Sequence, residues 1–230
     1  MCGRAKLPQD YSTIKNQLGL SDNAPAPNIR PSWNIPPTQD MLCVRRHPKT
    51  GERVATLMRW GLIPEWAKSE RLEYPTFNAR AETIDAKPTF RGAWKAGRRC
   101  LVVTDGFYEW RKGDKQPFAI ARANKKLTIM AGLWEIWRSP AGETIRSCTI
   151  ITTVANALLA PIHHRMPVIL AKSDWPAWLG EAPAEVPVAG AELKALLKPY
   201  PAEDMTLWPV DKRIGNVKND DPSLAEALVA

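Results

Sequence analysis

A cysteine directly follows the first methionine, and its position makes it the most chemically suggestive residue of the chain. An initiator methionine is normally removed when the next residue is small, and removal would leave an α-amine and a thiol together on Cys2. Ordinary pKa values of about 8 for the amine and about 8.5 for the thiol give both groups usable nucleophilic fractions near neutral pH. A 1,2-aminothiol reacts twice with an aldehyde, because the amine forms an imine and the thiol then closes a thiazolidine ring. An imine alone is easily hydrolysed and can drive β-elimination, which ring closure prevents.

Charged and amide side chains accompany this cysteine in two short segments. Arg4 places a permanent positive charge two residues from Cys2. A second polar run contains Asn78, Arg80 and Glu82. Each feature also has a purely structural interpretation: an exposed cysteine without function, a turn asparagine, and a surface salt bridge between Arg80 and Glu82.

A glutamate among aromatic residues is a candidate acid or base. Glu109 lies in the segment Asp105–Trp110, which follows the apolar run Cys100–Thr104. Aromatic neighbours withdraw a carboxyl group from water and raise its pKa, which suits a general acid or base. A glutamate that points to solvent at the end of a strand is the alternative.

Two of the three histidines are adjacent, at His163 and His164. A histidine pair can bind a metal ion, but no other ligand stands near it in the sequence, so we favour proton transfer or a structural histidine. We expect no metal and no cofactor. None of the four cysteines forms a C-x-x-C pair. Three of them, Cys43, Cys100 and Cys148, lie in apolar runs and are interpreted as core thiols.

The composition is that of a globular protein with a basic surface. Of 230 residues, 44% are hydrophobic and 24% are charged, and the net charge is +8. Ten tryptophans beside arginines and lysines suit stacking against nucleic-acid bases. We find no apolar stretch of about 18 residues and no secretion signal, and therefore expect a cytoplasmic or nucleoid protein without a membrane partner.

The pattern of apolar runs predicts an α+β domain with a curved, mostly antiparallel sheet, because many strands are separated only by short helices. The proline-rich stretch Pro25–Pro37 is expected to be an irregular loop, and Ala182–Gly190 is interpreted as a loop. The predicted strands are Met41–Arg46, Arg53–Trp60, Cys100–Thr104, Pro117–Arg122, Leu127–Trp134, Cys148–Val154 and Pro167–Leu170, and the predicted helices are Pro8–Leu18, Thr89–Lys95, Ser173–Leu179, Ala191–Leu197 and Ser223–Leu228.

Six short motifs follow one another in the order in which they occur in a known family. On these motifs the chain resembles the SOS-response-associated peptidase (SRAP) family, the abasic-site processing proteins that crosslink to DNA. The match runs from residue 2 to about residue 219 and covers nearly the whole chain. The motifs are Met-Cys-Gly-Arg at the start, Trp60–Pro64 with Trp66, Asn78–Thr83, Gly106–Trp110, His163–Pro167 and Gly215–Asn219.

The resemblance implies a single domain over residues 1–230, with a curved, barrel-like, mostly antiparallel sheet, short peripheral helices and a basic groove for single-stranded DNA. It also implies four residues for the chemistry. Cys2 would be the new N-terminus and the crosslinking nucleophile, and Asn78 would position it and the lesion. Glu109 would be the acid or base beside the amine, and His163 would assist opening of the sugar ring and reversal of the crosslink.

The same resemblance implies residues that hold the DNA. Arg4, Arg80 and Arg165 would contact phosphates. Thr152 and Trp66 match positions that line the lesion pocket or the base stack. The chain departs from the family pattern at His164, where Asn or Asp is frequent, and at Asp85–Thr89, which lacks the arginine of some members.

Three functions remain open on the sequence. The first is covalent capture of abasic sites in single-stranded DNA by Cys2, with lyase-like chemistry if the imine persists. The second is a cysteine peptidase with an N-terminal nucleophile, whose substrate is in the simplest case its own bond between Met1 and Cys2. The third is a non-covalent single-strand binding module. We expect a monomer in each case.

Overall fold

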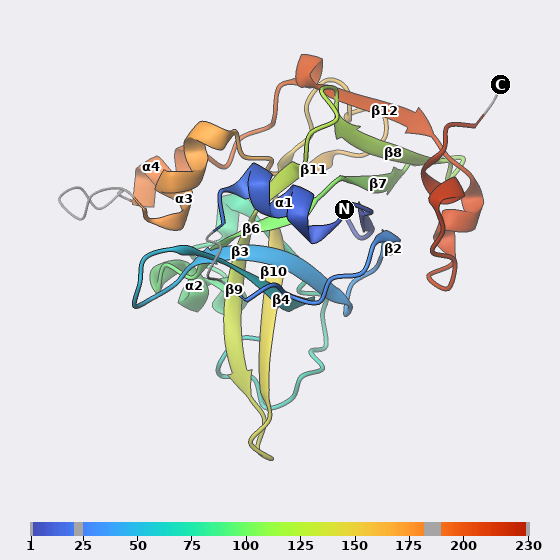
Figure 1. Ribbon diagram of the computed structural model, residues 1–230. Helices are drawn as coiled ribbons and strands as arrows, with labels where there is room; N and C mark the ends of the chain where they lie inside the picture. The colour runs from blue at the N-terminus through green and yellow to red at the C-terminus, as the bar shows by residue number, and fades with distance from the viewer. Residues whose placement is uncertain (1, 21–24, 182–189, 229–230) are drawn as a thin grey trace.

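Five strands close on themselves into a barrel, and the other elements pack around it (Figure 1). The strands neighbour one another in the order β10, β4, β3, β6 and β9, and β9 pairs again with β10. These pairings are antiparallel except that of β4 with β10. The computed structural model describes residues 2–20, 25–181 and 190–228. The barrel strands are β3 (Asp40–Arg46), β4 (Arg53–Trp60), β6 (Arg99–Thr104), β9 (Thr128–Arg138) and β10 (Thr144–Val154).

A second, antiparallel sheet lies above the barrel in the view of Figure 1. Its strands are ordered β12, β8, β7, β1 and β2. At Gly106, the first residue of β7, a Cβ atom would lie 2.5 Å from the carbonyl oxygen of Ile120, so glycine permits the close approach of β7 to β8. The strands are β1 (Ala5–Leu7), β2 (Ser32–Ile35), β7 (Gly106–Trp110), β8 (Pro117–Arg122) and β12 (Met205–Pro209).

Short helices lie on the outside. The first begins after Asp10, whose carboxylate accepts a hydrogen bond from the backbone N–H of Thr13 at 3.0 Å, and ends at Gly19 in the left-handed conformation. Among the described residues no helix is long and apolar enough to cross a membrane. The α-helices are α1 (Tyr11–Leu18), α2 (Pro88–Lys95), α3 (Trp175–Leu179) and α4 (Gly190–Ala195), and the 3₁₀ segments are η1 (Ala81–Thr83), η2 (Lys172–Asp174), η3 (Ala202–Asp204), η4 (Lys212–Gly215) and η5 (Pro222–Ala225).

The second half of β10 brings together two short strands from distant parts of the sequence. β5 (Asn78–Arg80) runs parallel to residues 150–152, and β11 (Arg165–Pro167) runs antiparallel to residues 152–154. β9 has left β10 at this point, because their last paired residues are Ile150 and Gly132. The edge that β9 vacates is the one that β11 occupies, so each backbone polar group of β10 can find a partner.

The predicted fold class is confirmed. The protein is an α+β domain with a curved, mostly antiparallel, barrel-like sheet. Strands Arg53–Trp60 and Pro117–Arg122 have the predicted bounds, and the other barrel strands differ from prediction only at their ends. Burial is nearly continuous in the central parts of β3, β6, β9 and β10, whereas β4 is mostly half-buried. The core thiols are confirmed as well, since Cys43, Cys100 and Cys148 are fully buried.

Five strands were missed, because they are short or carry few β-branched residues. β2 lies inside the proline-rich stretch that was expected to be a loop. β5 and β7 fall in motifs that were interpreted for their chemistry, β1 directly follows the first motif, and β12 was not anticipated. These strands form because they pair with a neighbouring strand. A run this short shows no alternation of apolar and polar residues by which it could be predicted.

Other predictions need correction. Residues 223–228 form no α-helix but the 3₁₀ segment η5, because the chain then extends and the N–H of Leu228 bonds to the carbonyl of Pro209. The strand predicted at Pro167–Leu170 is β11, which begins earlier, at Arg165, and ends at Pro167. The chain that follows it hydrogen-bonds to β9. The helix predicted at Ser173–Leu179 is divided between η2, which contains Ser173, and α3, which begins at Trp175. Residues 182–189 of the predicted loop lie outside the described part of the chain.

Candidate active site and nucleic-acid groove

Cys2 is buried in the hydrophobic core, immediately before β1. Its exposed fraction is 1%, and its carbonyl oxygen accepts a hydrogen bond from Asn78 Nδ2 at 2.7 Å. Burial raises the pKa of the thiol far above its usual range, and the negative charge of Glu109 raises it further. In this arrangement the thiol holds its proton more tightly than an ordinary cysteine does, and the thiolate fraction expected once Met1 is removed stays a prediction. The thiol needs a neighbouring base before it can act as a nucleophile.

Glu109 is the neighbouring carboxylate. It lies on β7 opposite Phe118 of β8 and is 4% exposed. Burial raises the pKa of this carboxyl group, as its aromatic neighbours predicted. The alternative of a glutamate that points to solvent is wrong. A carboxyl group with a raised pKa exchanges protons nearer to neutral pH than an ordinary glutamate does.

His163 faces this carboxylate from the loop before β11. Its Nδ1 lies 3.9 Å from Glu109 Oε1 and accepts a hydrogen bond from the backbone N–H of Arg165 at 3.0 Å. The same Nδ1 also lies 3.3 Å from the carbonyl oxygen of Arg165, to which it donates when the neutral ring carries its proton on Nδ1. Partial burial lowers the pKa of His163 and favours the neutral form. His164 is exposed and stacks on His163, with ring centroids 4.4 Å apart.

Arg165 is held inside the protein. Its guanidinium is 7% exposed and binds both carboxylate oxygens of Glu82, at 2.6 and 2.9 Å, and the carbonyl oxygen of Thr152 at 2.6 Å. Glu82 thus pairs with Arg165 and not with Arg80, whose side chain is exposed. The hydroxyl of Thr152 is also buried, 3.4 Å from the carbonyl oxygen of Ala79. Arg165 and Thr152 are therefore buried beneath the surface of the site. Their contacts with DNA stay predictions.

A groove opens on the solvent side of Asn78. It has a volume of about 620 Å³, and its cationic lining residues are Arg80 and Lys87. A smaller hollow of about 180 Å³ adjoins it at Pro88 and Thr89 and contains Trp66. Trp66 is 58% exposed. The groove and the hollow therefore place positive charge and an exposed aromatic side chain along one surface. Asn78, which hydrogen-bonds to Cys2, lines the groove.

Arg4 is also tied internally. Its Nη1 donates to Asn34 Oδ1 at 2.6 Å and to the carbonyl oxygen of Ile214 at 2.8 Å, and the guanidinium lies 5.8 Å from the ring of Trp110. A phosphate contact of Arg4 stays a prediction. Asn34 was not identified from the sequence, because it lies in the proline-rich stretch Pro25–Pro37 that was expected to be a loop.

The described residues contain no group of three or more His, Cys, Asp or Glu side chains placed to hold a metal ion. The site instead combines a thiol, a carboxyl group, an imidazole and an amide. Such a set can transfer protons and support attack on an electrophilic carbon.

The burial of Glu109 predicts a pH-dependent gain in stability for Glu109→Gln. The raised pKa means that the folded protein holds this proton more tightly than the unfolded chain, so the carboxyl group costs stability as the pH rises above the ordinary glutamate value. Glutamine mimics the protonated form. The melting temperature of Glu109→Gln should therefore exceed that of the wild type at pH 8 and approach it at pH 4, by about 2–4 °C for each kcal/mol relieved.

The matched control is Glu143→Gln, which alters an exposed carboxylate in the turn between β9 and β10. It should leave the melting temperature nearly unchanged at both pH values. A Glu109→Gln protein that melts below the wild type at pH 8 would show that charged Glu109 is stabilised by its partners.

Comparison with known proteins agrees with the geometry. The sequence matches the family described as SOS response associated peptidase (SRAP) over residues 1–217. It is 38% identical over 230 residues to the abasic site processing protein YoqW of Bacillus subtilis (strain 168), covering 99% of this chain and 100% of the relative. It is 37% identical over 224 residues to the abasic site processing protein HMCES of Gallus gallus, covering 84% of this chain and 65% of the relative. A crystal structure of a protein from Bacteroides thetaiotaomicron superposes with a TM-score of 0.84 at 26% identity, over 99% of this chain and 100% of that one. This protein belongs to the SRAP family.

Proposed function

We propose that this protein processes abasic sites in DNA by forming a covalent bond between Cys2 and the lesion in a single strand. The observation that carries the proposal is the meeting of Cys2, Asn78, Glu109 and His163 at the inner end of a groove with exposed Arg80. These residues come from segments far apart in the sequence. The names of the relatives, abasic site processing proteins, support the same lesion.

The reaction begins with removal of Met1, which adds one water across the Met1–Cys2 bond and frees the α-amine of Cys2. The lesion sugar is mostly a closed ring, and opening it moves the hydroxyl proton of C1′ to the ring oxygen. His163 would give a proton to the ring oxygen while a neighbouring base accepts the proton of the C1′ hydroxyl. The product is an aldehyde at C1′.

Glu109 would then carry out the proton transfers that accompany formation of the imine. The amine attacks the aldehyde carbon, and its two protons pass one after the other through Glu109 to the former carbonyl oxygen, which leaves as water when the imine forms. Sulfur adds to the resulting imine carbon, and the thiol proton passes to nitrogen. One water is lost overall, and a thiazolidine results. Because charged Glu109 raises the pKa of the Cys2 thiol, protonation of Glu109 also makes the thiol easier to ionise.

Asn78 contributes an acceptor at the same point. Its Oδ1 is buried and has no hydrogen-bond partner within the described residues, while its Nδ2 holds the Cys2 carbonyl. A free amine on Cys2 or a lesion hydroxyl group would satisfy that oxygen. A buried acceptor without a partner costs free energy, so supplying the donor favours binding.

Burial of Cys2 argues for a single strand. The C1′ atom of a duplex lies inside the helix, and bringing it to a residue that is 1% exposed requires extrusion of the nucleotide. A single strand can present the sugar without breaking base pairs. The groove's exposed aromatic and cationic residues suit that substrate.

General cleavage of peptides is less well supported. A cysteine peptidase needs a thiolate, but burial holds the pKa of the Cys2 thiol high. The low pKa of His163 disfavours the imidazolium that would stabilise a thiolate. We therefore limit the peptidase reaction to the bond between Met1 and Cys2, and β-elimination to whatever imine escapes ring closure.

The nucleophile is tested with an abasic oligonucleotide on a denaturing gel. The wild type should give a heat-stable shifted band. Cys2→Ala keeps the amine but loses the thiol, so it should give a band only after borohydride reduction. A protein with an uncleaved N-terminal tag should bind DNA but form no crosslink. A stable band from either protein would contradict the thiazolidine.

Proton transfer is tested with the two stacked histidines as a matched pair. His163→Ala should slow crosslinking by about 100-fold, the usual scale for a positioned acid or base. His164→Ala removes a ring of the same size from the exposed side and should slow it far less. Single-turnover rates on the same oligonucleotide decide the matter, and a greater loss at His164 would reverse the assignment.

The groove is tested by salt titration of binding to an undamaged single strand. Arg80→Ala should lower the slope of log K against log salt by about 0.7, because one phosphate contact is lost. Trp66→Ala should cost about 1–3 kcal/mol of binding with little change in slope, because stacking is not ionic. The control is Arg138→Ala at the exposed end of β9. An unchanged slope for Arg80→Ala would remove Arg80 from the DNA path.

A further inference from the structure

Asn34 of β2 joins the two ends of the chain. The residue is 1% exposed, and its Oδ1 accepts a hydrogen bond from Arg4 Nη1 at 2.6 Å. Its Nδ2 donates to the carbonyl oxygens of Ile214, Asn216 and Asn219 at 3.4, 3.0 and 2.6 Å. The amide thus uses its acceptor on the N-terminal segment and its donors on a segment about 180 residues later.

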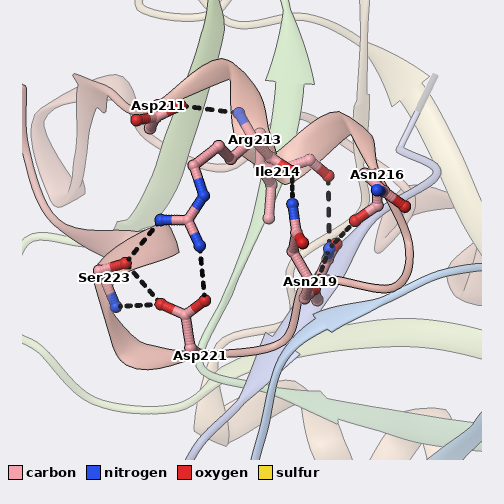
Figure 2. A network of polar contacts seen from close by, with 8 residues as sticks. Asp211, Arg213, Ile214, Asn216, Asn219, Asp221 and Ser223 are labelled. Atoms are coloured by element: carbon pink, nitrogen blue, oxygen red, sulfur yellow. Dashed lines mark hydrogen bonds and ion pairs between the residues drawn. The ribbon is translucent and has the colours of Figure 1, made fainter.

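The later segment, residues 211–223, is here called the C-terminal turn. It is fixed by its own polar contacts (Figure 2). Arg213 pairs with Asp221 at 3.1 Å and accepts a hydrogen bond at its carbonyl oxygen from Asn219 Nδ2 at 2.8 Å. Asp211 accepts the N–H of Arg213 at 2.8 Å. These bonds lie at the exposed surface. Because they fix the backbone of the turn, its carbonyl oxygens are held in position to accept hydrogen bonds from Asn34.

A second connection runs from the turn to the strand that carries Glu109. Asp220 Oδ1 accepts the backbone N–H of Trp33 at 2.6 Å, and the carbonyl oxygen of Trp33 accepts the hydroxyl of Tyr108 at 2.9 Å. The N–H of Tyr108 in turn donates to the carbonyl oxygen of Arg4 at 2.9 Å. Both connections therefore end on Arg4, two residues from Cys2.

We propose that Asn34 and the C-terminal turn form a latch that holds Cys2 against Glu109, and that Asn34 is a positioning residue that acts through Arg4. The amide lies in β2 and does not reach the reacting atoms; it fixes the segment that bears them. Asn216 and Asn219 of the latch belong to the motif Gly215–Asn219, whereas Asp220 lies just beyond it. Its consequence for crosslinking rests on the proposed function, whereas its effect on Cys2 does not.

The first test measures the protection of each thiol in the native protein. Iodoacetamide is added without denaturant, and peptide mass spectrometry follows alkylation of the four cysteines, with the N-terminus checked by intact mass. Asn34→Ala should raise the rate at Cys2 by about tenfold or more, while the rates at Cys43, Cys100 and Cys148 stay low. The core thiols serve as internal controls, because global unfolding would expose all four.

Gln116→Ala is the matched control variant. Gln116 Nε2 also donates to two backbone carbonyls, of Pro117 at 3.0 Å and Val210 at 2.8 Å, but makes no contact with residues 2–4. It should leave the rate at Cys2 unchanged. If Asn34→Ala exposes all four thiols, the same labelling is repeated with Arg213→Ala. This variant removes a contact within the C-terminal turn at its exposed side and leaves Asn34 in place. Selective labelling of Cys2 then supports the latch, and uniform labelling or no change overturns it.

The second test is a double-mutant cycle on crosslinking at saturating protein. Asn34→Ala should lower the maximal rate by about 10- to 100-fold, the scale of a small misplacement, with the half-saturating concentration within about twofold. If Asn34 acts through Arg4, adding Asn34→Ala to Arg4→Ala should change the rate little further. Multiplicative losses would overturn the route through Arg4. A wild type that does not crosslink would defeat the proposed function and leave the alkylation result to decide the latch.

Discussion

The change of partners along β10 is the constraint on which the site depends. An eleven-residue strand inside a domain must satisfy the hydrogen bonds of both edges, but β9 pairs only with residues 144–150 of β10 and β4 only with residues 147–148. β5 and β11 complete the second half from opposite sides. Because β5 begins with Asn78 and β11 directly follows the two histidines, satisfying the backbone of β10 also places the amide and the imidazole on either side of one strand.

Burial then acts on every titratable group of the site in the same sense. It raises the pKa values of the Cys2 thiol and the Glu109 carboxyl group and lowers that of His163, so each is driven toward its uncharged form. In the proposed reaction, nucleophilicity would therefore come from proton transfer between neighbours and not from a resident thiolate. The same exclusion of water would slow hydrolysis of the imine and leave it available for ring closure.

The sequence predicted what depends on neighbours in the chain and failed where distant segments meet. The desolvation of Glu109 followed from the aromatic residues beside it. The partner of Glu82 did not, because Arg165 lies 83 residues away while Arg80 is adjacent in sequence. β5 and β11 have three residues each, too few to show a period of two, and exist because β10 has vacant edges. Asn34 was hidden in a stretch whose prolines indicated a loop.

The basic charge of the protein divides into two kinds of arginine with different consequences for binding an anionic strand. Arg4 and Arg165 are anchored by carbonyl and carboxylate oxygens, so their side chains are already ordered when a ligand arrives. Arg80 is exposed and must lose rotamer freedom to hold a phosphate. Glu82 neutralises Arg165 but no described carboxylate pairs with Arg4, which therefore keeps an uncompensated positive charge beside the reactive end. In the proposed function, the fixed charge of Arg4 would attract the strand without an ordering cost, whereas Arg80 would add a phosphate contact at the cost of ordering its side chain, and salt would weaken both interactions.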